Sequence, residues 1–194
     1  MRLIINLVLL ALVALLVFVL ISSIRAPIAF QAEKQKRVDA VVDRLKDLRK
    51  AQEIYRDVTG EFTNDYSELK NVLQTGKIMT VAVIGDPDDP NNSEISYDTT
   101  YVPAMQSINE YGISLDSLQM VPYGNPGTEF ELFADTMTYQ KTLVHVIEAK
   151  TTFNQFMGAE FSKEKYKKYD DRYNPKAPLK FGDRYTPNLT GNWE

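Results

Sequence analysis

The longest apolar run in the chain lies at its amino-terminal end. Residues 3–24 comprise nineteen apolar residues, one asparagine and two serines, with no charge. As a helix rising about 1.5 Å per residue, this run is long enough to cross the hydrocarbon core of a bilayer, which is about 30 Å thick. The pattern therefore predicts a membrane anchor over residues 1–25, in contact with lipid through residues 3–24.

A cleavable signal peptide is the alternative to a retained anchor. Met1 and Arg2 followed by an apolar run are also how such peptides begin. The run is longer than a typical signal-peptide core, however, and no small-x-small cleavage triplet follows it promptly. A retained single-pass helix is therefore favoured.

After the anchor, the apolar positions adopt a helical period. Pro27 is expected to close the membrane segment with a kink, and residues 30–58 then form a long amphipathic helix. Its apolar stripe, at three- and four-residue steps, is Val38, Val41, Leu45, Leu48, Tyr55 and Val58. The remaining positions carry mixed charge, which indicates a solvated face. Five basic residues from Arg25 to Arg44 offer an alternative contact with anionic lipid headgroups.

Local signals place the end of this helix and the start of another. Gly60 stands where a left-handed residue normally terminates a helix. Asp65, with Glu68 three residues later, predicts a capping box for a second short helix that ends near Leu73. These two helices are expected to fill residues 26–75.

The pattern changes to β character over residues 76–160. Short segments rich in β-branched and aromatic residues predict strands, with residues 138–141 leading into the last of them: Lys77–Ile84, 130–134 and 142–148. Strand-like pieces also occur at residues 95–97 and 113–115, among prolines and glycines. A small antiparallel sheet is expected here, so the fold class is α+β, with the long helix packed on the sheet.

Residues 161–194 show no helix or strand period and are expected to form an extended tail on the surface of the domain. Lysines and tyrosines alternate over residues 163–173, a composition also used to bind single-stranded nucleic acid. Acidic residues within the same stretch argue against nucleic acid and favour tyrosines that cover the domain or dock on a partner protein. Trp193 either packs back on the fold or reaches a partner.

The charged residues are unevenly distributed. Residues 51–160 carry five Lys/Arg against seventeen Asp/Glu, and both flanking regions are mildly basic. A plain positive-inside count around the anchor would place the large domain in the cytoplasm. That rule weakens when the basic residues belong to a folded helix, and an acidic domain behind an amino-terminal anchor is commonly exported. We therefore expect a single-pass protein of the bacterial inner membrane with a periplasmic carboxy-terminal domain.

No residue pattern typical of catalysis occurs in the chain. Cysteine is absent, and His145, the only histidine, stands in a predicted strand without a second ligand at metal-binding spacing. Neither a nucleophile elbow nor a glycine-rich phosphate loop is present. The sequence thus predicts no catalytic, cofactor-binding or metal-binding residues and a protein that is not an enzyme.

One loop leaves a metal alternative open. Residues 86–94, from Asp86 to Glu94, gather carboxylates and amides of the kind that bind Ca²⁺. Pro90 and Asn91 stand where an EF-hand needs a ligand and a glycine, respectively. A solvated acidic turn is favoured, with Ca²⁺-dependent binding as the alternative.

Two resemblances extend these predictions. The junction from anchor to domain, Leu48-Arg-Lys-Ala-Gln-Glu-Ile-Tyr55 followed by Thr59-Gly-Glu-Phe62, resembles that of type IV pilins and type II secretion pseudopilins. Their Gly-Phe processing site and the glutamate of their mature helix do not occur in residues 1–24. The resemblance implies a pilin-like arrangement, with a filament or secretion subunit as an alternative function.

The second resemblance covers most of the chain. Val42-Asp-Arg-Leu-Lys-Asp-Leu-Arg-Lys-Ala-Gln52, Ile147-Glu-Ala-Lys150 and the terminal Gly-Asn-Trp are similar to segments of uncharacterised single-pass envelope proteins of the Bacteroidetes type. This resemblance implies an envelope protein with one anchored domain and adds no site residues. The expected function is that of a structural or scaffolding subunit that contacts protein partners or other copies of itself.

Overall fold

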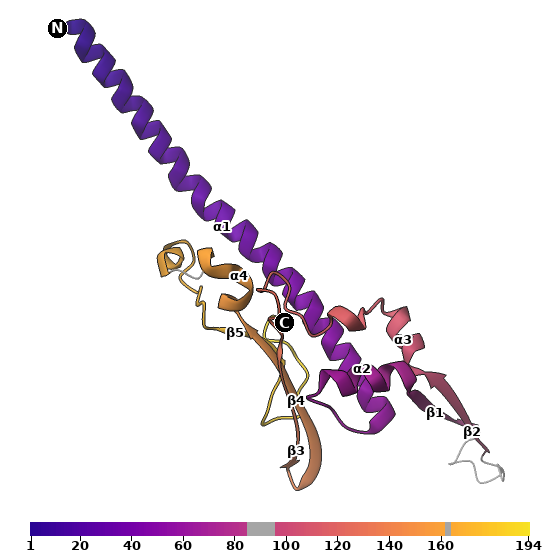
Figure 1. The fold of residues 1–194 in the computed structure, drawn as a ribbon. Helices are drawn as coiled ribbons and strands as arrows, with labels where there is room; N and C mark the ends of the chain where they lie inside the picture. Colours follow the sequence, from indigo (N-terminus) through magenta and orange to yellow (C-terminus); the bar gives the residue numbers. More distant parts are fainter. Residues whose placement is uncertain (85–95, 162–163) are drawn as a thin grey trace.

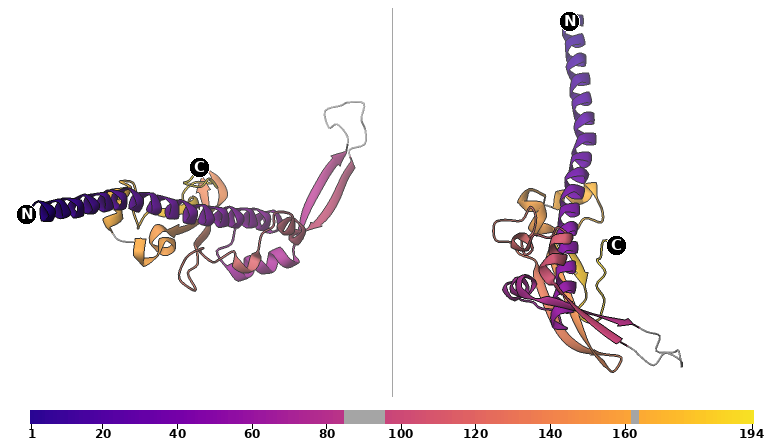
Figure 2. Two further views of the ribbon diagram at one scale, coloured as in Figure 1. Left: turned by 90° about the horizontal axis from the view of Figure 1, so that it is seen from above. Right: turned by 90° about the vertical axis from the view of Figure 1, so that its right-hand side faces the viewer.

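A single helix runs from the amino terminus through the body of the molecule. The computed structural model describes residues 1–84, 96–161 and 164–194, and its first element is helix α1 (Arg2–Thr59), 58 residues long. At about 1.5 Å per residue this helix extends for roughly 87 Å. Figures 1 and 2 show it bending gently, without the sharp kink expected at Pro27. Only one intrahelical hydrogen bond is lost at a proline, so strong helix formers on both sides keep anchor and stalk in one rod.

The second half of α1 forms one wall of the hydrophobic core, as its period predicts. Val41, Leu45, Leu48 and Tyr55 are all at most 2% exposed, and Val38 and Val58 pack against them at the edge. The helix ends at Gly60, whose φ of 90° is the left-handed conformation expected there.

Helix α2 (Tyr66–Thr75) follows the loop and packs back on α1. The Asp65 carboxylate caps it by accepting hydrogen bonds from the amides of Ser67 and Glu68. The predicted reciprocal half of the capping box is wrong, because the Glu68 carboxylate accepts a 2.8 Å hydrogen bond from the Thr63 hydroxyl instead. The Thr63 hydroxyl in turn accepts a hydrogen bond from the backbone amide of Asp65. Glu68 is therefore connected to the Asp65 amide through the Thr63 side chain and not directly.

In the described ranges the β structure forms two antiparallel sheets where a single sheet was expected. Among these residues, strands β1 (Lys77–Ile84) and β2 (Ser96–Pro103) pair only with each other. Strands β3 (Glu131–Tyr139), β4 (Thr142–Thr152) and β5 (Pro178–Gly182) form the second sheet in the order β3-β4-β5. Residues 138–141 complete β3 and its turn to β4, with Gln140 and Lys141 at positive φ. Such a turn matches the twist of a hairpin.

Short helices interrupt the region that the sequence assigns to strands. Helix α3 (Ala104–Glu110) follows β2 directly, and the 3₁₀ turn η1 (Leu115–Ser117) begins at the last residue of the strand-like piece expected at residues 113–115. Helix α4 (Phe153–Phe161), which is interrupted at Gly158, follows β4 and leads to the 3₁₀ helix η2 (Glu164–Tyr169). Residues 76–160 are therefore mixed, because these short apolar segments are ambiguous without their tertiary contacts.

The carboxy-terminal segment is part of the core and not an extended surface tail. Strand β5 completes the second sheet, and Leu179, Phe181, Tyr166 and Tyr173 are buried. Trp193 packs back on the fold, which settles the alternative left open by the sequence. In Figure 1, α4 lies beside α1 at the end of the domain nearest the anchor, and the β1–β2 hairpin projects from the opposite end.

Candidate interaction surfaces

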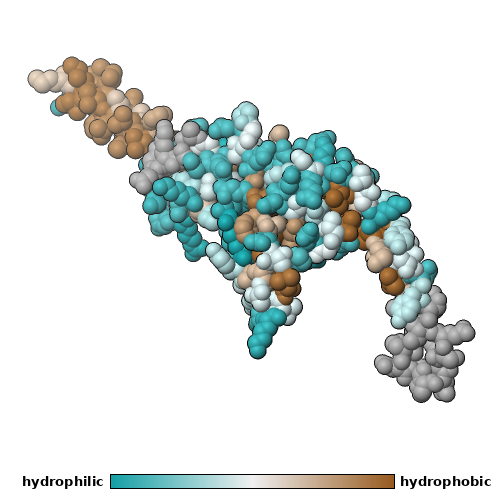
Figure 3. Space-filling model, turned by 60° about the horizontal axis from the view of Figure 1, so that its bottom comes forward, coloured by the Kyte–Doolittle hydropathy of each residue, from teal (hydrophilic) through white to brown (hydrophobic). Residues whose placement is uncertain are grey.

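The first part of α1, residues 2–26, is exposed to solvent along its length. It is long and apolar enough to span a membrane, and its most apolar window has none of its surface buried. Hydrophobic side chains from Leu3 to Ile24 are exposed all around this part, which stands out in Figure 3 as a projecting apolar rod. A helix that is apolar on every side is suited to lipid or to other apolar helices, not to water.

The β1–β2 hairpin is a second exposed apolar element. The register pairs Met79 with Tyr101 and Val81 with Thr99, and Tyr97 lies two residues further along the same face. Met79, Val81, Tyr97 and Tyr101 are 44–67% exposed. At the base, Ile78 and Val102 on the opposite face are half-buried, and Ile78 packs against the core. The base thus fixes the direction of the hairpin, while one of its faces offers apolar side chains to solvent.

This hairpin face was only partly predicted. The sequence predicts β structure for residues 77–84 and strand-like character at residues 95–97. The alternation of Tyr97, Thr99 and Tyr101 is a further signal, because alternate residues of a strand lie on the same face.

An aromatic cluster joins the domain to α1 just below the anchor. The ring centroid of Phe30 lies 5.0 Å from that of Tyr166, 5.1 Å from that of Tyr173 and 6.2 Å from that of Tyr169. The tyrosines of residues 163–173, which the sequence assigns to a surface tail, therefore cover helix α1 at Phe30. Phe30 is 1% exposed as a result.

The charged face of α1 binds the domain's own backbone and side chains. Lys34 pairs with Asp170, and the Arg37 guanidinium donates to the carbonyl oxygens of Phe156 and Met157 at 3.0 and 2.8 Å. Arg49 similarly donates to the Leu189 carbonyl oxygen at 3.1 Å. These cations hold α4, Asp170 and the carboxy-terminal segment against the helix. The face expected to be solvated is therefore occupied in part by internal contacts, which also engage Lys34 and Arg37 of the residues offered as an alternative headgroup contact.

The buried carboxylate of Glu148 is satisfied within the second sheet. It accepts from Lys180 at 2.7 Å and from Arg184 at 2.8 Å. Burial by itself would raise the pKa of Glu148, but the hydrogen bonds and charges of Lys180 and Arg184 outweigh it and lower the pKa below its ordinary value. Because both oxygens are occupied by these cations, we assign this group to stability rather than chemistry.

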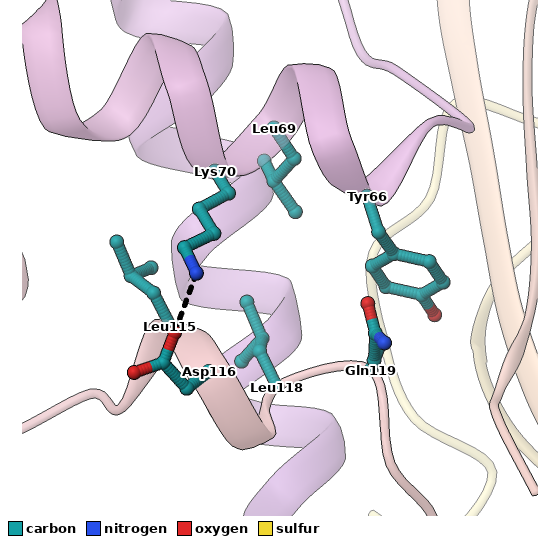
Figure 4. Close-up of a pocket in the computed structure, with 7 residues that line it drawn as sticks. All are labelled: Tyr66, Leu69, Lys70, Leu115, Asp116, Leu118 and Gln119. Atoms are coloured by element: carbon teal, nitrogen blue, oxygen red, sulfur yellow. Dashed lines mark hydrogen bonds and ion pairs between the residues drawn. The ribbon is translucent and has the colours of Figure 1, made fainter. Parts of the chain in front are cut away.

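The pocket drawn in Figure 4 lies between α2 and η1 and has a volume of about 110 Å³. Lys70 crosses its mouth to pair with Asp116. On its other side, burial raises the pKa of Tyr66, whose hydroxyl donates to the Phe130 carbonyl oxygen at 3.1 Å. Ligand pockets usually measure roughly 300–1,000 Å³, so this pocket is a packing gap suited to water.

The remaining candidates for metal binding in the sequence are His145 and the acidic segment from Asp86 to Glu94. His145 is half-buried in β4, as expected, with its Nδ1 3.0 Å from the Thr136 hydroxyl. Within the part of the chain that the structure describes, no group of three or more acidic or histidine side chains could hold a metal ion. The candidate calcium segment at Asp86 to Glu94 lies outside the described residues.

The fold and its surfaces define an α+β domain built on a helix that can span a membrane. No protein-family model matches this chain, and no curated protein or solved structure is detectably similar to it.

Proposed function

We propose that this protein is a structural or scaffolding subunit of the bacterial envelope, anchored by one helix in the inner membrane with its domain in the periplasm. It acts through protein–protein contacts and not through catalysis. The observation that carries this proposal is the placement of the β1–β2 hairpin, a projecting ribbon with an exposed apolar face, at the end of the domain opposite the anchor.

The hairpin supports a contact role on energetic grounds. An isolated two-stranded ribbon is only marginally stable in water. Neither outer edge of this ribbon pairs with another strand among the described residues, so its edges present backbone groups that a partner could pair with. A contiguous exposed apolar face on such an element is typical of an interaction site. Covering Met79, Val81, Tyr97 and Tyr101 with a protein partner or a second copy of the chain would remove this surface from water.

The experiment is to compare complexes extracted from native membranes. Full-length protein is solubilised in a mild detergent and its size is measured on native gels and by size exclusion with light scattering. We expect a complex larger than the monomer for the wild type, and loss of that complex when the face is made polar by the double substitution Met79→Ser and Tyr101→Ser. A wild type that extracts only as a monomer after crosslinking in intact membranes would contradict the proposal.

A matched control separates specific contact from general surface polarity. Tyr185 is 76% exposed and lies after β5, so Tyr185→Ser removes an exposed ring without touching the hairpin. The complex should persist in this variant. Equal losses in the control and in the hairpin variant would assign the effect to nonspecific association.

The location of the domain has its own test. The chain contains no cysteine, so Tyr185→Cys introduces a single thiol on the domain surface. A membrane-impermeant maleimide should label this variant once the outer membrane has been made permeable and before the inner membrane is lysed. Labelling only after lysis of the inner membrane would place the domain in the cytoplasm.

A pilin-like filament or secretion subunit is the second candidate. It is favoured by the arrangement of α1, whose apolar first half is fully exposed while its second half forms the wall of an α+β domain. Such a subunit requires amino-terminal processing and polymerisation. Intact-mass measurement of the protein from native membranes distinguishes the two, since a species that begins at Met1 speaks against processing and a shortened, polymeric species speaks for it.

A further inference from the structure

A groove lies where the anchor meets the domain, between α1 and η2. Phe18 and Val19 line one end of it, Ser22 and Ser23 lie further along α1, and Lys168 and Tyr169 of η2 face them from the domain across an open groove of about 730 Å³. The groove belongs to none of the elements that carry the proposed contact function.

The position of the groove along α1 sets its surroundings. Phe18 and Val19 belong to the apolar run of residues 3–24, whereas Pro27 lies just beyond it and also lines the groove. When the run spans a bilayer, the groove therefore extends from the hydrocarbon layer into the headgroup layer. Tyrosine and lysine are residues that favour this interface, and both are present on the η2 side.

The η2 wall is held in place by α1 itself. The Gln31 amide nitrogen donates to the Tyr169 carbonyl oxygen at 3.1 Å, and Lys34 pairs with Asp170 immediately after η2. The ring of Phe30 packs against that of Tyr169. The backbone and ring of Tyr169 are thus positioned before any ligand arrives, which lowers the ordering cost of binding on this wall.

The charge at the mouth of the groove is positive. Lys167 and Lys168 are exposed, and the Lys168 ammonium lies 4.9 Å from the centroid of the Tyr169 ring without an ion pair to any described residue. The adjacent Asp170 is already paired with Lys34, and Asp171 is exposed. A cation at headgroup depth beside an apolar wall matches an anionic lipid, whose phosphate and acyl chain are joined in the same order.

We propose that this groove binds an anionic phospholipid of the bilayer that α1 spans. One acyl chain lies along Phe18 and Val19, and the headgroup phosphate is held by the Lys168 ammonium with the hydroxyl groups of Ser22 and Ser23 nearby. The proposal rests on the membrane anchoring in the proposed function, and goes beyond it by giving the anchor a preference among lipids. The apolar end of the groove is the reason for choosing a lipid rather than a free phosphate ester.

The test uses full-length protein in nanodiscs that contain phosphatidylglycerol and phosphatidylcholine in equal amounts. Native mass spectrometry counts the lipids of each kind that remain bound after release from the disc. We expect phosphatidylglycerol to be retained about fivefold over phosphatidylcholine, which corresponds to the roughly 1 kcal/mol of one lysine near an anionic surface. In Lys168→Gln the two lipids should be retained about equally.

Controls make each outcome decisive. Lys77→Gln removes an exposed lysine at the base of the hairpin, far along the chain from the groove, and should keep the wild-type preference. Equal retention of both lipids by the wild type, or equal effects of Lys77→Gln and Lys168→Gln, would overturn the proposal. So would loss of the preference on adding millimolar glycerol 3-phosphate, which would point to a site for a soluble phosphate ester. A chain that fails to enter nanodiscs at all would instead refute the anchoring.

Discussion

The ring of Phe30 stacks on the ring of Tyr166, with centroids 5.0 Å apart and planes inclined by 14°. Phe30 belongs to the first turns of α1 beyond the anchor, whereas Tyr166 comes from η2 near the end of the chain. The contact therefore closes the domain around α1 at the end nearest the apolar run of residues 3–24. Loss of this contact should loosen η2 and α4 before it affects the sheet formed by β3, β4 and β5.

The Phe30→Ala substitution tests the aromatic cluster. Removing a ring that is 1% exposed should lower the free energy of unfolding by about 3–5 kcal/mol, since it leaves a cavity among Tyr166, Tyr169 and Tyr173. The measurement is denaturant unfolding of the full-length protein in detergent. Phe18→Ala, at a ring that is 70% exposed on the anchor, should change domain stability by less than about 0.5 kcal/mol. Similar losses in both variants would show that the cluster does not support the domain.

Gly182 is expected to be intolerant of any side chain. Its φ is 75°, and a Cβ atom there would collide with the carbonyl oxygen of Ile147 on the paired strand β4. Gly182→Ala should therefore cost several kcal/mol by separating β5 from β4. Gly127 has a φ of 82° but open space around it, so Gly127→Ala should cost only the left-handed strain of about 1–2 kcal/mol. Thermal unfolding of both variants measures the difference, and equal midpoints would contradict the predicted clash.

Stability should fall in acid because of Glu148. Its folded-state pKa is lowered from 4.5, because hydrogen bonds from Lys180 and Arg184 overcome the opposing effect of burial. A lowered pKa stabilises the folded state above about pH 4.5, and this contribution is lost as the pH falls through the folded-state value. The substitution Lys180→Met removes one of the two cations that lower the pKa of Glu148. The difference in the free energy of unfolding between wild type and variant should therefore be widest near pH 7 and shrink below pH 4.5.

A second ion pair of the same sheet provides the control for this pH series. Lys150 lies 3.1 Å from Glu131, whose side chain is 58% exposed. Exposed pairs contribute little, so Lys150→Met should lower stability by no more than about 1 kcal/mol at neutral pH. The measurement is the thermal midpoint of each variant from pH 7 to pH 3. If the difference in thermal midpoint between wild type and Lys180→Met does not change with pH, ionisation of Glu148 does not cause the loss of stability in acid.

Calcium offers a direct test of the acidic segment that begins at Asp86. We expect millimolar Ca²⁺ to leave the thermal midpoint of the full-length protein unchanged, because the spacing of its carboxylates departs from an EF-hand at Pro90 and Asn91. A ligand that binds only the folded state must raise the midpoint. A rise with Ca²⁺ that Mg²⁺ does not reproduce would favour the calcium-dependent alternative.

Local signals in the sequence were sufficient for much of the architecture. The stripe from Val41 to Tyr55 placed α1 against the core, Gly60 ended it, and the β-branched run Lys77–Ile84 gave β1 with its observed bounds. Each of these depends on periodicity or on the conformational preference of a few neighbouring residues. Exposure of an apolar hairpin face could not be read in the same way, because the alternation of side chains does not say whether another element covers them.

The sequence by itself determined the apolar helix that can span a membrane, the amphipathic stretch that follows it, the helix ends at Gly60 and Asp65, and the α+β class. Each of these follows from length, period and side-chain chemistry within one segment. Only the tertiary structure decided that Pro178–Gly182 completes the second sheet and that cations of α1 bind α4 and Asp170, just after η2. The contacts of α1 join residues more than a hundred positions apart, such as Lys34 and Asp170, which are 136 residues apart. The pairing of β5 with β4 spans a shorter separation, as in Lys180 and Glu148, 32 residues apart, but it too lies beyond any local pattern. Contacts at that separation are selected by the free energy of the whole packed core, and no local pattern encodes them.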